Sequence, residues 1–322
     1  MTSRRSLVIA VDLGGTFTKI GLIDRSGEVL AETRVSTKIT AQTDGDGGQG
    51  TVSWLGTELA AYIKAEADAL DAAVIGYGVV VPGIIDAEGG TVRAAPNIGW
   101  YDIELAAPLS DQLGLPGGIG HDVRTAGLAE WHLGAGRGVS NLLFVPLGTG
   151  IAAAAVVDGR LLAADGYAGE LGHIAVPAAG QQQCACGGIG CLEIVASAAG
   201  VVRTRRRLAG DDQQLTAVQV AELARQGDPA AQGAFEVAAT ALAEAFVTAL
   251  TLLGSERIVV GGGLSGASDL LFPRIEEEFD RRLTFQRRPE LTLSDFGSQA
   301  GMVGAGLLGW RAVEGATAEG IR

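Results

Sequence analysis

The sequence has few cysteines and few basic residues, and each scarcity excludes a class of protein. Only three of its 322 residues are cysteine, and all three lie within eight residues of one another, which does not suit a disulfide framework. Lys and Arg number 24 against 37 Asp and Glu, which gives a formal net charge of −13. A nucleic-acid binder needs a basic face, whereas the one basic run, residues 203–207, reads as the solvated end of a helix. We therefore expect no nucleic-acid partner.

Long uninterrupted apolar segments are also missing. The apolar run that follows the N-terminal Met-Thr-Ser-Arg-Arg covers only residues 7–11, which is too short for a signal peptide. The longest apolar segment, residues 230–253, is interrupted by Glu236 and Glu244. Hydrophobic residues make up 47% of the chain and charged residues 19%, which is typical of a well-buried globular protein. We expect a cytoplasmic protein with no membrane partner.

Glycine, in contrast, is abundant, and it punctuates a pattern that occurs twice. Each copy reads as a strand, a glycine-rich turn, a second strand, a turn and a third strand. The first copy has its strands at residues 7–11, 18–23 and 29–35, and the second at residues 142–147, 151–157 and 160–163. Elsewhere strands alternate with helices, which predicts an α/β fold. Two such halves facing each other would form a cleft, a common place for a ligand.

Three glycine-rich turns are candidate contacts for a nucleotide. Without Cβ atoms, their backbone can approach phosphate oxygens and offer N–H donors. The first turn adds an Asp that could hold Mg²⁺ through water, although alone it also fits a simple hairpin. The third follows a buried strand and suits adenine and ribose, or equally a flexible strand-to-helix connection. The candidate residues are Asp12, Gly14, Gly15 and Thr16, then Gly148, Thr149 and Gly150, and then Gly261, Gly262 and Gly263.

Asp122 is the candidate catalytic residue. It follows a predicted strand in Gly120-His-Asp122 and precedes a predicted helix at residues 123–133. Asp is favoured as a helix N-cap, and that structural role fits the position. The two roles are compatible, because an Asp at a strand end can also accept the proton of a substrate hydroxyl. His121 beside it suits a sugar pocket and a structural position equally well.

The three cysteines and one histidine predict a metal site. Cys184, Cys186 and Cys191 with His173 make the donor set of a closed tetrahedral zinc site, and the intervening glycines allow the loop to fold. Three inert buried thiols are the alternative. No further Cys or His near this loop is left to act as a nucleophile, so we expect the zinc to be structural.

Together these motifs resemble the ROK family of sugar kinases (repressors, open reading frames and kinases) over nearly the whole chain. Asp12-Leu-Gly-Gly-Thr16 and Leu147-Gly-Thr-Gly150 resemble the two phosphate motifs of that family. Gly169-Glu-Leu-Gly-His173 is similar to its sugar and metal motif, and the segment from Cys184 to Glu193 to its zinc signature. The order of the motifs is specific to the family, whereas each glycine motif alone is not.

The resemblance implies a fold and a domain division. The fold is the duplicated actin-like ATPase (ribonuclease H-like) α/β fold, with two domains flanking a cleft. We expect a smaller domain at residues 1–119, completed by a C-terminal helix at about residues 304–322. Residues 120–303 would form a larger domain that carries the zinc loop. The family resemblance also implies that the protein forms a homodimer or a homotetramer.

The resemblance also implies a role for each motif. Asp122 would be the catalytic base, and ATP with Mg²⁺ would bind between the first two glycine turns. Gly83, Asn97, Glu170, His173 and Glu193 would line the sugar pocket, with His173 using one ring nitrogen for zinc and the other for the sugar. The sequence departs from the family where His121 stands in place of the usual sugar-contacting Asn. It also departs at residues 152–154, three alanines where relatives have more glycine.

The implied activity is phosphorylation of a hexose by ATP, with glucose as the first choice of substrate. N-acetylglucosamine, N-acetylmannosamine and mannose are alternative substrates. A sugar-binding protein without catalysis and a transcriptional repressor are alternatives of another kind. Repressors of this family carry a DNA-binding helical segment before the first phosphate motif, and only eleven residues precede Asp12. We therefore expect the kinase.

Overall fold

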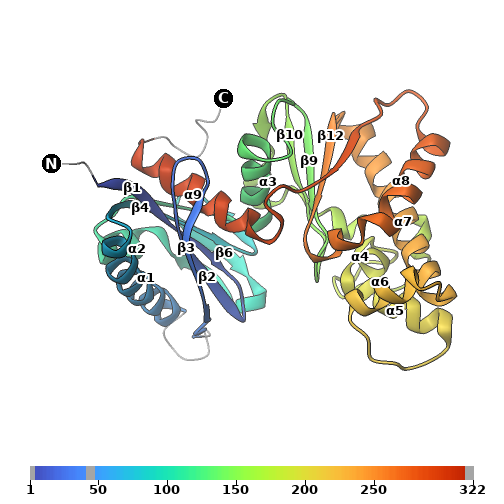
Figure 1. Ribbon diagram of the computed structural model, residues 1–322, viewed down its shortest axis with the longest axis horizontal. Coiled ribbons are helices and arrows are strands. Elements are labelled where there is room, and N and C mark those ends of the chain that lie inside the picture. The colour runs from blue at the N-terminus through green and yellow to red at the C-terminus, as the bar shows by residue number, and fades with distance from the viewer. Residues whose placement is uncertain (1–3, 41–47, 316–322) are drawn as a thin grey trace. The chain divides into compact units, whose positions relative to one another are not determined.

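The computed structural model describes residues 4–40 and 48–315, apart from the side chain of Asn97. It divides into two compact units. The first comprises Met1–Leu133, Ala163–Ala168 and Gln299–Arg322, and the second comprises Gly134–Leu162 and Gly169–Ser298. Figure 1 shows their helices and strands along the chain.

The first unit is built on a five-stranded sheet in the order β3-β2-β1-β4-β8. β1 pairs antiparallel with β2 and parallel with β4, which in turn is parallel to β8. The strands are β1 (Arg5–Leu13), β2 (Phe17–Ile23), β3 (Val29–Ser36), β4 (Ala72–Val81) and β8 (Gly117–His121). The helices are α1 (Gln49–Ala69), α2 (Ala106–Leu113), α3 (Asp122–Leu133) and α9 (Ala300–Val313).

The central strand β1 is buried on both faces of the sheet, which explains its continuous apolar run. Leu7, Ile9 and Val11 pack in one cluster with Leu55 of α1 and Leu109 of α2. The alternate residues Val8 and Ala10 pack in another cluster with Met302 and Ala305 of α9. Because side chains alternate along a strand, both sets must be apolar when helices cover both faces.

The second unit repeats the same sheet. Its strand order is β11-β10-β9-β12-β13, with β9 antiparallel to β10 and parallel to β12, and β12 parallel to β13. The strands are β9 (Leu142–Pro146), β10 (Ala154–Val157), β11 (Arg160–Leu161), β12 (Arg257–Gly261) and β13 (Glu290–Leu293). Three antiparallel strands followed by two parallel ones in each unit confirm the predicted internal duplication.

Helices of the second unit enclose a large apolar core. They are α4 (Glu193–Ala196), α5 (Ala198–Ala209), α6 (Ala217–Arg225), α7 (Pro229–Leu253) and α8 (Ser268–Arg282). The N-cap predicted for α7 is confirmed, because the Asp228 carboxylate accepts a hydrogen bond of 2.7 Å from the Ala231 amide and Pro229 takes the first helical position.

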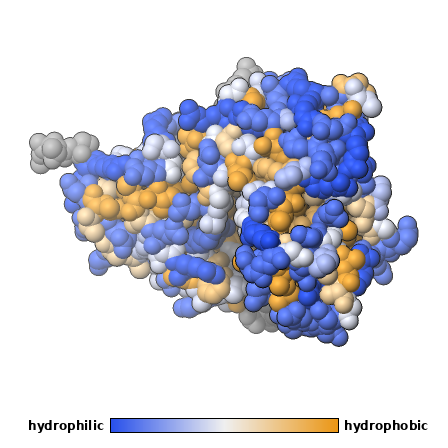
Figure 2. Space-filling view, turned by 45° about the vertical axis from the view of Figure 1, so that its right-hand side comes forward, coloured by the Kyte–Doolittle hydropathy of each residue, from blue (hydrophilic) through white to orange (hydrophobic). Residues whose placement is uncertain are grey.

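By length and composition α7 could cross a membrane, but half of its most apolar window is buried inside the unit. Its apolar residues are those of a core helix: Phe235, Leu242 and Phe246 are fully or almost fully buried. On the face shown in Figure 2, hydrophobic residues lie interspersed with hydrophilic ones. Such mixing is normal for a globular protein surface.

Two features of the first unit differ from, or add to, what the sequence suggested. A small sheet of β5 (Ile84–Asp86), β6 (Thr91–Ala95) and β7 (Trp100–Glu104) follows β4 and was not predicted. The predicted domain boundary after residue 119 also differs from the division into compact units, because α3 belongs to the first unit. A Cβ on Gly304 of α9 would lie 2.4 Å from the Thr125 carbonyl, so the bare glycine lets α9 pack directly on α3.

The strand predicted at residues 151–157 begins only at Ala154. The amides before it are bonded elsewhere: the Ile151 N–H donates to Glu193 at 3.0 Å and the Ala153 N–H donates to the Gly169 carbonyl at 2.6 Å. The Gly172 N–H in turn donates to the Ile151 carbonyl. The chain after the second glycine turn therefore pairs with the Gly169–Gly172 segment before it joins the sheet.

Candidate active site

In the first unit, the candidate residues gather at one edge of the sheet. β1, β4 and β8 are parallel neighbours, and Asp12 pairs with Val80 while Val81 pairs with His121. The first glycine turn, the turn that carries Gly83, and Asp122 each follow the carboxyl end of one of these strands. In α/β sheets, ligands bind at this edge.

The first glycine turn is closed by its own backbone and braced by threonines. The Gly14 N–H donates to the Phe17 carbonyl at 3.1 Å, and the Thr37 hydroxyl donates to the Gly14 carbonyl at 2.7 Å. Gly15 and Thr16 are exposed at its tip. Gly83 has a φ of +114°, and a Cβ there would lie 2.2 Å from the Ala94 carbonyl, so only glycine fits.

His121, not Asp122, caps the N-terminus of α3. Its Nδ1 accepts hydrogen bonds from the backbone amides of Val123 and Arg124 at 3.2 and 3.3 Å. In these two bonds Nδ1 is the acceptor, and the same atom lies 3.1 Å from Oδ1 of the neighbouring Asp122. Burial, with the Arg124 guanidinium nearby, lowers the pKa of His121 to about 3, which keeps the ring neutral.

The capping histidine leaves most of the Asp122 carboxylate available. Oδ1 accepts from the Val123 amide at 2.7 Å, and the side chain is 34% exposed. Burial raises the pKa of Asp122, while the Val123 amide and the Arg124 guanidinium oppose the rise. A carboxylate whose pKa is raised binds a proton more readily than ordinary Asp, which suits a general base.

The charge of Asp122 affects the pKa of Asp12. Burial and the Asp122 carboxylate raise the pKa of Asp12, and Lys19, whose Nζ lies 3.7 Å from Oδ2, opposes the rise. Two partly buried acids at one sheet edge form a local negative site. Such a site suits a divalent cation, since hard cations prefer oxygen ligands.

In the second unit, two glycine turns meet at the equivalent edge. β9 and β12 are parallel neighbours, so the turns that follow them emerge side by side. The Leu264 N–H donates to the Leu147 carbonyl at 2.9 Å, and a Cβ on Gly262 would lie 2.5 Å from that carbonyl. Gly148–Gly150 and Gly261–Gly263 therefore form one glycine-lined edge.

The predicted sugar-contacting glutamates differ in their surroundings. Glu193 starts α4, and its carboxylate accepts the Ile151 amide at 3.0 Å, beside the second glycine turn. A Cβ on Gly150 would lie 2.8 Å from that carboxylate, so the Glu193 side chain lies directly against the second glycine turn. Glu170 is exposed. Asn97 lies in a short 3₁₀ turn, Pro96–Ile98, and its side chain is outside the described part of the structure.

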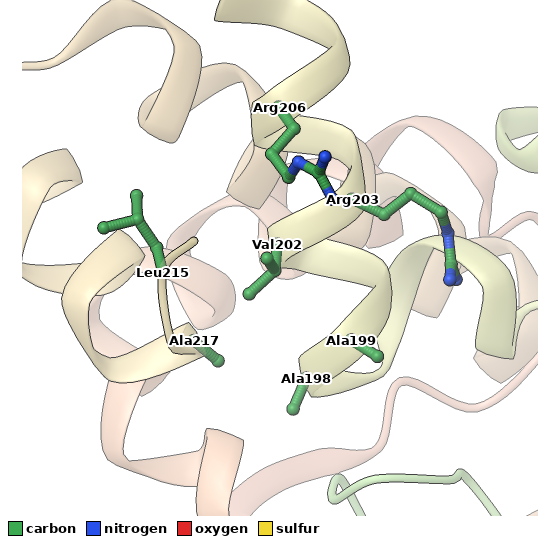
Figure 3. A pocket seen from close by; sticks show the side chains of 7 residues that line it. All are labelled: Ala198, Ala199, Val202, Arg203, Arg206, Leu215 and Ala217. Carbon is green, nitrogen blue, oxygen red and sulfur yellow. The ribbon is translucent and has the colours of Figure 1, made fainter. Parts of the chain in front are cut away.

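The sequence did not predict a cleft beside the second glycine turn. It opens between α5 and the start of α6 and has a volume of about 410 Å³ (Figure 3). The Ala198 N–H at its rim donates to the Gly148 carbonyl at 2.9 Å, which ties the start of α5 to the glycine turn. Its lining is mostly small and apolar with two arginines: Ala198, Ala199, Val202, Arg203, Arg206, Leu215 and Ala217.

The structure brings the four predicted metal ligands together. Their ligand atoms all lie within 4.8 Å of one another. Cys184 Sγ lies 3.9 Å from His173 Nδ1, and Cys186 Sγ lies 3.7 Å from Cys191 Sγ. Ligands about 2.3 Å from a tetrahedral zinc ion lie about 3.8 Å apart, so the cluster fits that ion. His173 presents Nδ1 to the thiols and keeps Nε2 for another partner.

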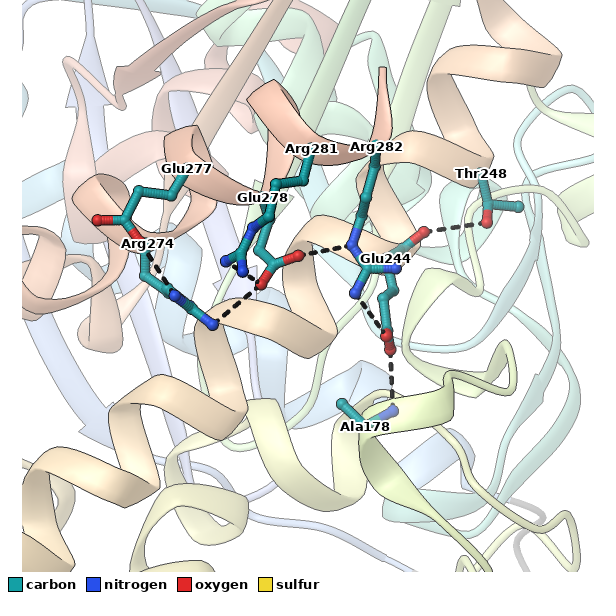
Figure 4. A network of polar contacts seen from close by, with 8 residues as sticks. All are labelled: Ala178, Glu244, Thr248, Arg274, Glu277, Glu278, Arg281 and Arg282. Atoms are coloured by element: carbon teal, nitrogen blue, oxygen red, sulfur yellow. Dashed lines mark hydrogen bonds and ion pairs between the residues drawn. The ribbon is translucent and has the colours of Figure 1, made fainter. Parts of the chain in front are cut away.

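A buried carboxylate of α7 anchors the loop that carries this cluster. Glu244 accepts the Ala178 amide at 2.9 Å and the Arg282 guanidinium at 3.0 Å, and Arg282 also pairs with Glu278 at 2.7 Å (Figure 4). Ala178 lies in the turn Pro177–Ala179, between His173 and Cys184. Glu244 in the apolar helix α7 is thus bonded to the metal loop on one side and to α8 on the other.

Comparisons with known proteins decide the family. The model of the ROK family matches residues 8–311. The chain belongs to the ROK family. The predicted resemblance is confirmed, and the two matching sheets are the duplicated actin-like fold of its sugar kinases.

Several relatives in the ROK family are named for phosphorylation of glucose. A glucokinase of Halalkalibacterium halodurans is 33% identical over 93% of this chain and 94% of its own length. The crystal structure of a ROK family glucokinase from Streptomyces griseus in complex with glucose and AMPPNP is 29% identical. It has a TM-score of 0.76 and covers 95% of this chain and 99% of its own.

The ROK family also contains regulators of similar fold. The crystal structure of a ROK family transcriptional regulator, a homologue of the Escherichia coli MLC protein, has a TM-score of 0.85 at 27% identity. It covers 96% of this chain and 79% of its own. The fold alone therefore does not distinguish kinases from regulators. Only the residues of the site can make that distinction.

Proposed function

We propose that this protein transfers the γ-phosphate of ATP to a hydroxyl of a hexose, and that the hexose is glucose. The observation that carries the proposal is the place of Asp122 at the sheet edge that also holds the first glycine turn and Asp12. The relatives named glucokinase, and the glucose complex from Streptomyces griseus, support the choice of sugar.

Asp122 is proposed as the base that takes the proton of the attacking hydroxyl. His121 occupies two backbone amides at the start of α3, so the Asp122 carboxylate remains mostly free to face substrate. In phosphoryl transfer the protein mainly positions the reactants and stabilises charge, and a base that orients the nucleophile is one of its recurring parts.

The glycine turns are proposed to hold the nucleotide. Gly14, Gly15 and Thr16 would offer donors to phosphate oxygens, as would Gly148, Thr149 and Gly150, and Gly261–Gly263 would lie against ribose and adenine. Mg²⁺ would supply charge neutralisation at the phosphates, held near Asp12 through water. The cleft between α5 and α6 adjoins the second turn, and we assign it to the nucleoside end of ATP.

The sugar is proposed to be held by polar groups from several loops. These are Gly83, Asn97, His121, Asp122, Glu170, His173 and Glu193. His173 would bind structural Zn²⁺ through Nδ1 and a sugar hydroxyl through Nε2, so that the metal fixes the orientation of a sugar-binding ring. Zinc has no reactive role in this proposal, because a site with four protein ligands leaves no open position.

The test is ATP consumption by the full-length protein across a panel of sugars. The panel contains glucose, mannose, N-acetylglucosamine and N-acetylmannosamine, with sugar binding measured in parallel by calorimetry. We expect glucose to give the highest kcat/KM. Turnover with an N-acetylated sugar instead would move the substrate to an aminohexose, and sugar binding without ATP consumption would favour a non-catalytic or regulatory protein.

We also propose that the protein acts in the cytoplasm as a homodimer or homotetramer, without a nucleic-acid partner. The strongly acidic composition supports the expectation of no nucleic-acid partner, whereas the oligomeric state rests on the family resemblance alone. Light scattering on the purified protein tests the oligomeric state. A monomer would contradict that part of the proposal.

A further inference from the structure

The segment Ala163–Ala168 interrupts the second unit along the chain. It belongs to the first unit, although the residues on both sides of it belong to the second. Ala164 and Asp165 have φ angles of +46° and +53°, and Gly166 follows with +93°. Non-glycine residues in the left-handed region are strained and persist only where their surroundings fix them.

One buried side chain supplies such surroundings. Arg124 is 6% exposed, and its Nη1 donates to the carbonyls of Gly166 at 3.0 Å and Ala168 at 3.2 Å. The segment also lies against β5, where a Cβ on Gly166 would be 3.0 Å from the Ile84 side chain. Arg124 is the third residue of α3, two positions after Asp122.

We propose that Arg124 is a positioning residue that clamps Ala163–Ala168 to the base-bearing end of α3 and so fixes the backbone from which the Gly169–His173 sugar motif continues. Ala168, whose carbonyl Arg124 holds, is the residue directly before that motif. The inference rests on the proposed function only in its consequence for sugar binding. The clamp itself rests on the hydrogen bonds from Arg124 to the Gly166 and Ala168 carbonyls.

The first test is amide hydrogen exchange in the full-length protein and in Arg124→Met and Arg124→Lys. Lys is a point charge that does not reproduce the reach and planarity of guanidinium. We expect exchange at residues 163–168 and 169–173 to accelerate about tenfold in Arg124→Met, the scale of one lost charge-assisted contact, with a smaller effect in Arg124→Lys. Unchanged exchange in either segment would overturn the clamp.

Arg257→Lys is the matched control. Arg257 Nη1 also donates to two backbone carbonyls, those of Ala135 and Arg137, but at the amino end of β12, away from the glycine turns. The thermal stability of this variant reports the cost of losing such a bridge. We expect exchange at residues 163–173 to stay as in the unchanged protein.

The second test is glucose affinity, measured by calorimetry without ATP. We expect Arg124→Lys to raise the Kd for glucose several-fold and Arg257→Lys to leave it unchanged. Faster exchange with unaltered glucose affinity would overturn the positioning role. Failure of the unchanged protein to bind glucose would contradict the proposed function instead, and the exchange experiment would still decide the clamp.

Discussion

At the scale of single residues, His121 caps α3 and the neighbouring Asp122 is left for the proposed role of base. Asp122 in the sequence fits a simple N-cap, and that was the structural alternative to catalysis. The structure gives the cap to His121 Nδ1 and leaves the carboxylate partly exposed at the sheet edge. The histidine that departs from the family pattern therefore has a structural role that does not depend on touching sugar.

Changing His121 tests this role. His121→Ala removes the side-chain acceptor of the Arg124 amide and leaves the Val123 amide only Asp122 Oδ1, so the free energy of unfolding is expected to fall by about 1 kcal/mol, the usual cost of a lost cap. His121→Asn should retain most of the stability, because Asn is a good N-cap. Urea unfolding of both variants measures the difference. Equal stability of His121→Ala and the unchanged protein would contradict the cap.

The pH dependence of turnover tests the two ionisable groups separately. Burial raises the pKa of Asp122, and a base must be ionised, so kcat should fall as the pH drops through a pKa above that of ordinary Asp. The pKa of His121 is lowered to about 3, so this residue should add no limb near neutral pH. A limb near pH 6.5 that disappears in His121→Asn would show that His121 titrates during turnover.

At the scale of elements, the position of the glycine turns was the most predictable feature of the candidate site. Strand, turn and strand patterns identified them, and the parallel pairing of β1, β4 and β8 and of β9 and β12 aligns them at sheet edges. The anchor on the metal loop was not predictable. Glu244 looks in the sequence like an interruption of an apolar helix, and only the fold shows that Ala178 and Arg282 satisfy it.

Loss of a metal ligand should release zinc and loosen the sugar site. The unchanged protein is expected to contain about one equivalent of zinc, and Cys184→Ser should lose most of it, because a structural site needs all four ligands. The KM for glucose should rise as His173 loses its fixed orientation. Elemental mass spectrometry and kinetics measure the two effects. Full activity of zinc-free protein would contradict a role for the metal in shaping the site.

The anchor should control how firmly zinc is held. Glu244→Leu leaves the Ala178 amide without its acceptor, which costs about 1–3 kcal/mol, so zinc release to a chelator should accelerate by about tenfold or more. Glu244→Gln keeps an acceptor and should fall between. Glu277→Gln, at the exposed end of the same network, is the control and should release zinc at the ordinary rate. Equal rates in all variants would exclude the anchor.

At the scale of the whole molecule, the duplication was readable because each copy keeps the same strand and turn order. The division of the chain into two units was harder to predict from the sequence. Which unit α3 joins depends on close packing of α9 at Gly304, a contact between residues far apart in the sequence. The return of residues 163–168 to the first unit likewise depends on Arg124, and no local pattern indicates it.

The central claim is that Asp122 is the base of a hexose kinase, and turnover of Asp122→Asn tests it most directly. The variant should fold with undiminished stability at neutral pH. The reason is that a carboxyl whose pKa is raised by folding destabilises the folded state when ionised, a cost that disappears as the pH falls through that pKa. It should bind glucose normally, yet its kcat should fall by about 10²–10⁴-fold. Near-normal kcat in a folded, glucose-binding Asp122→Asn protein would contradict the account.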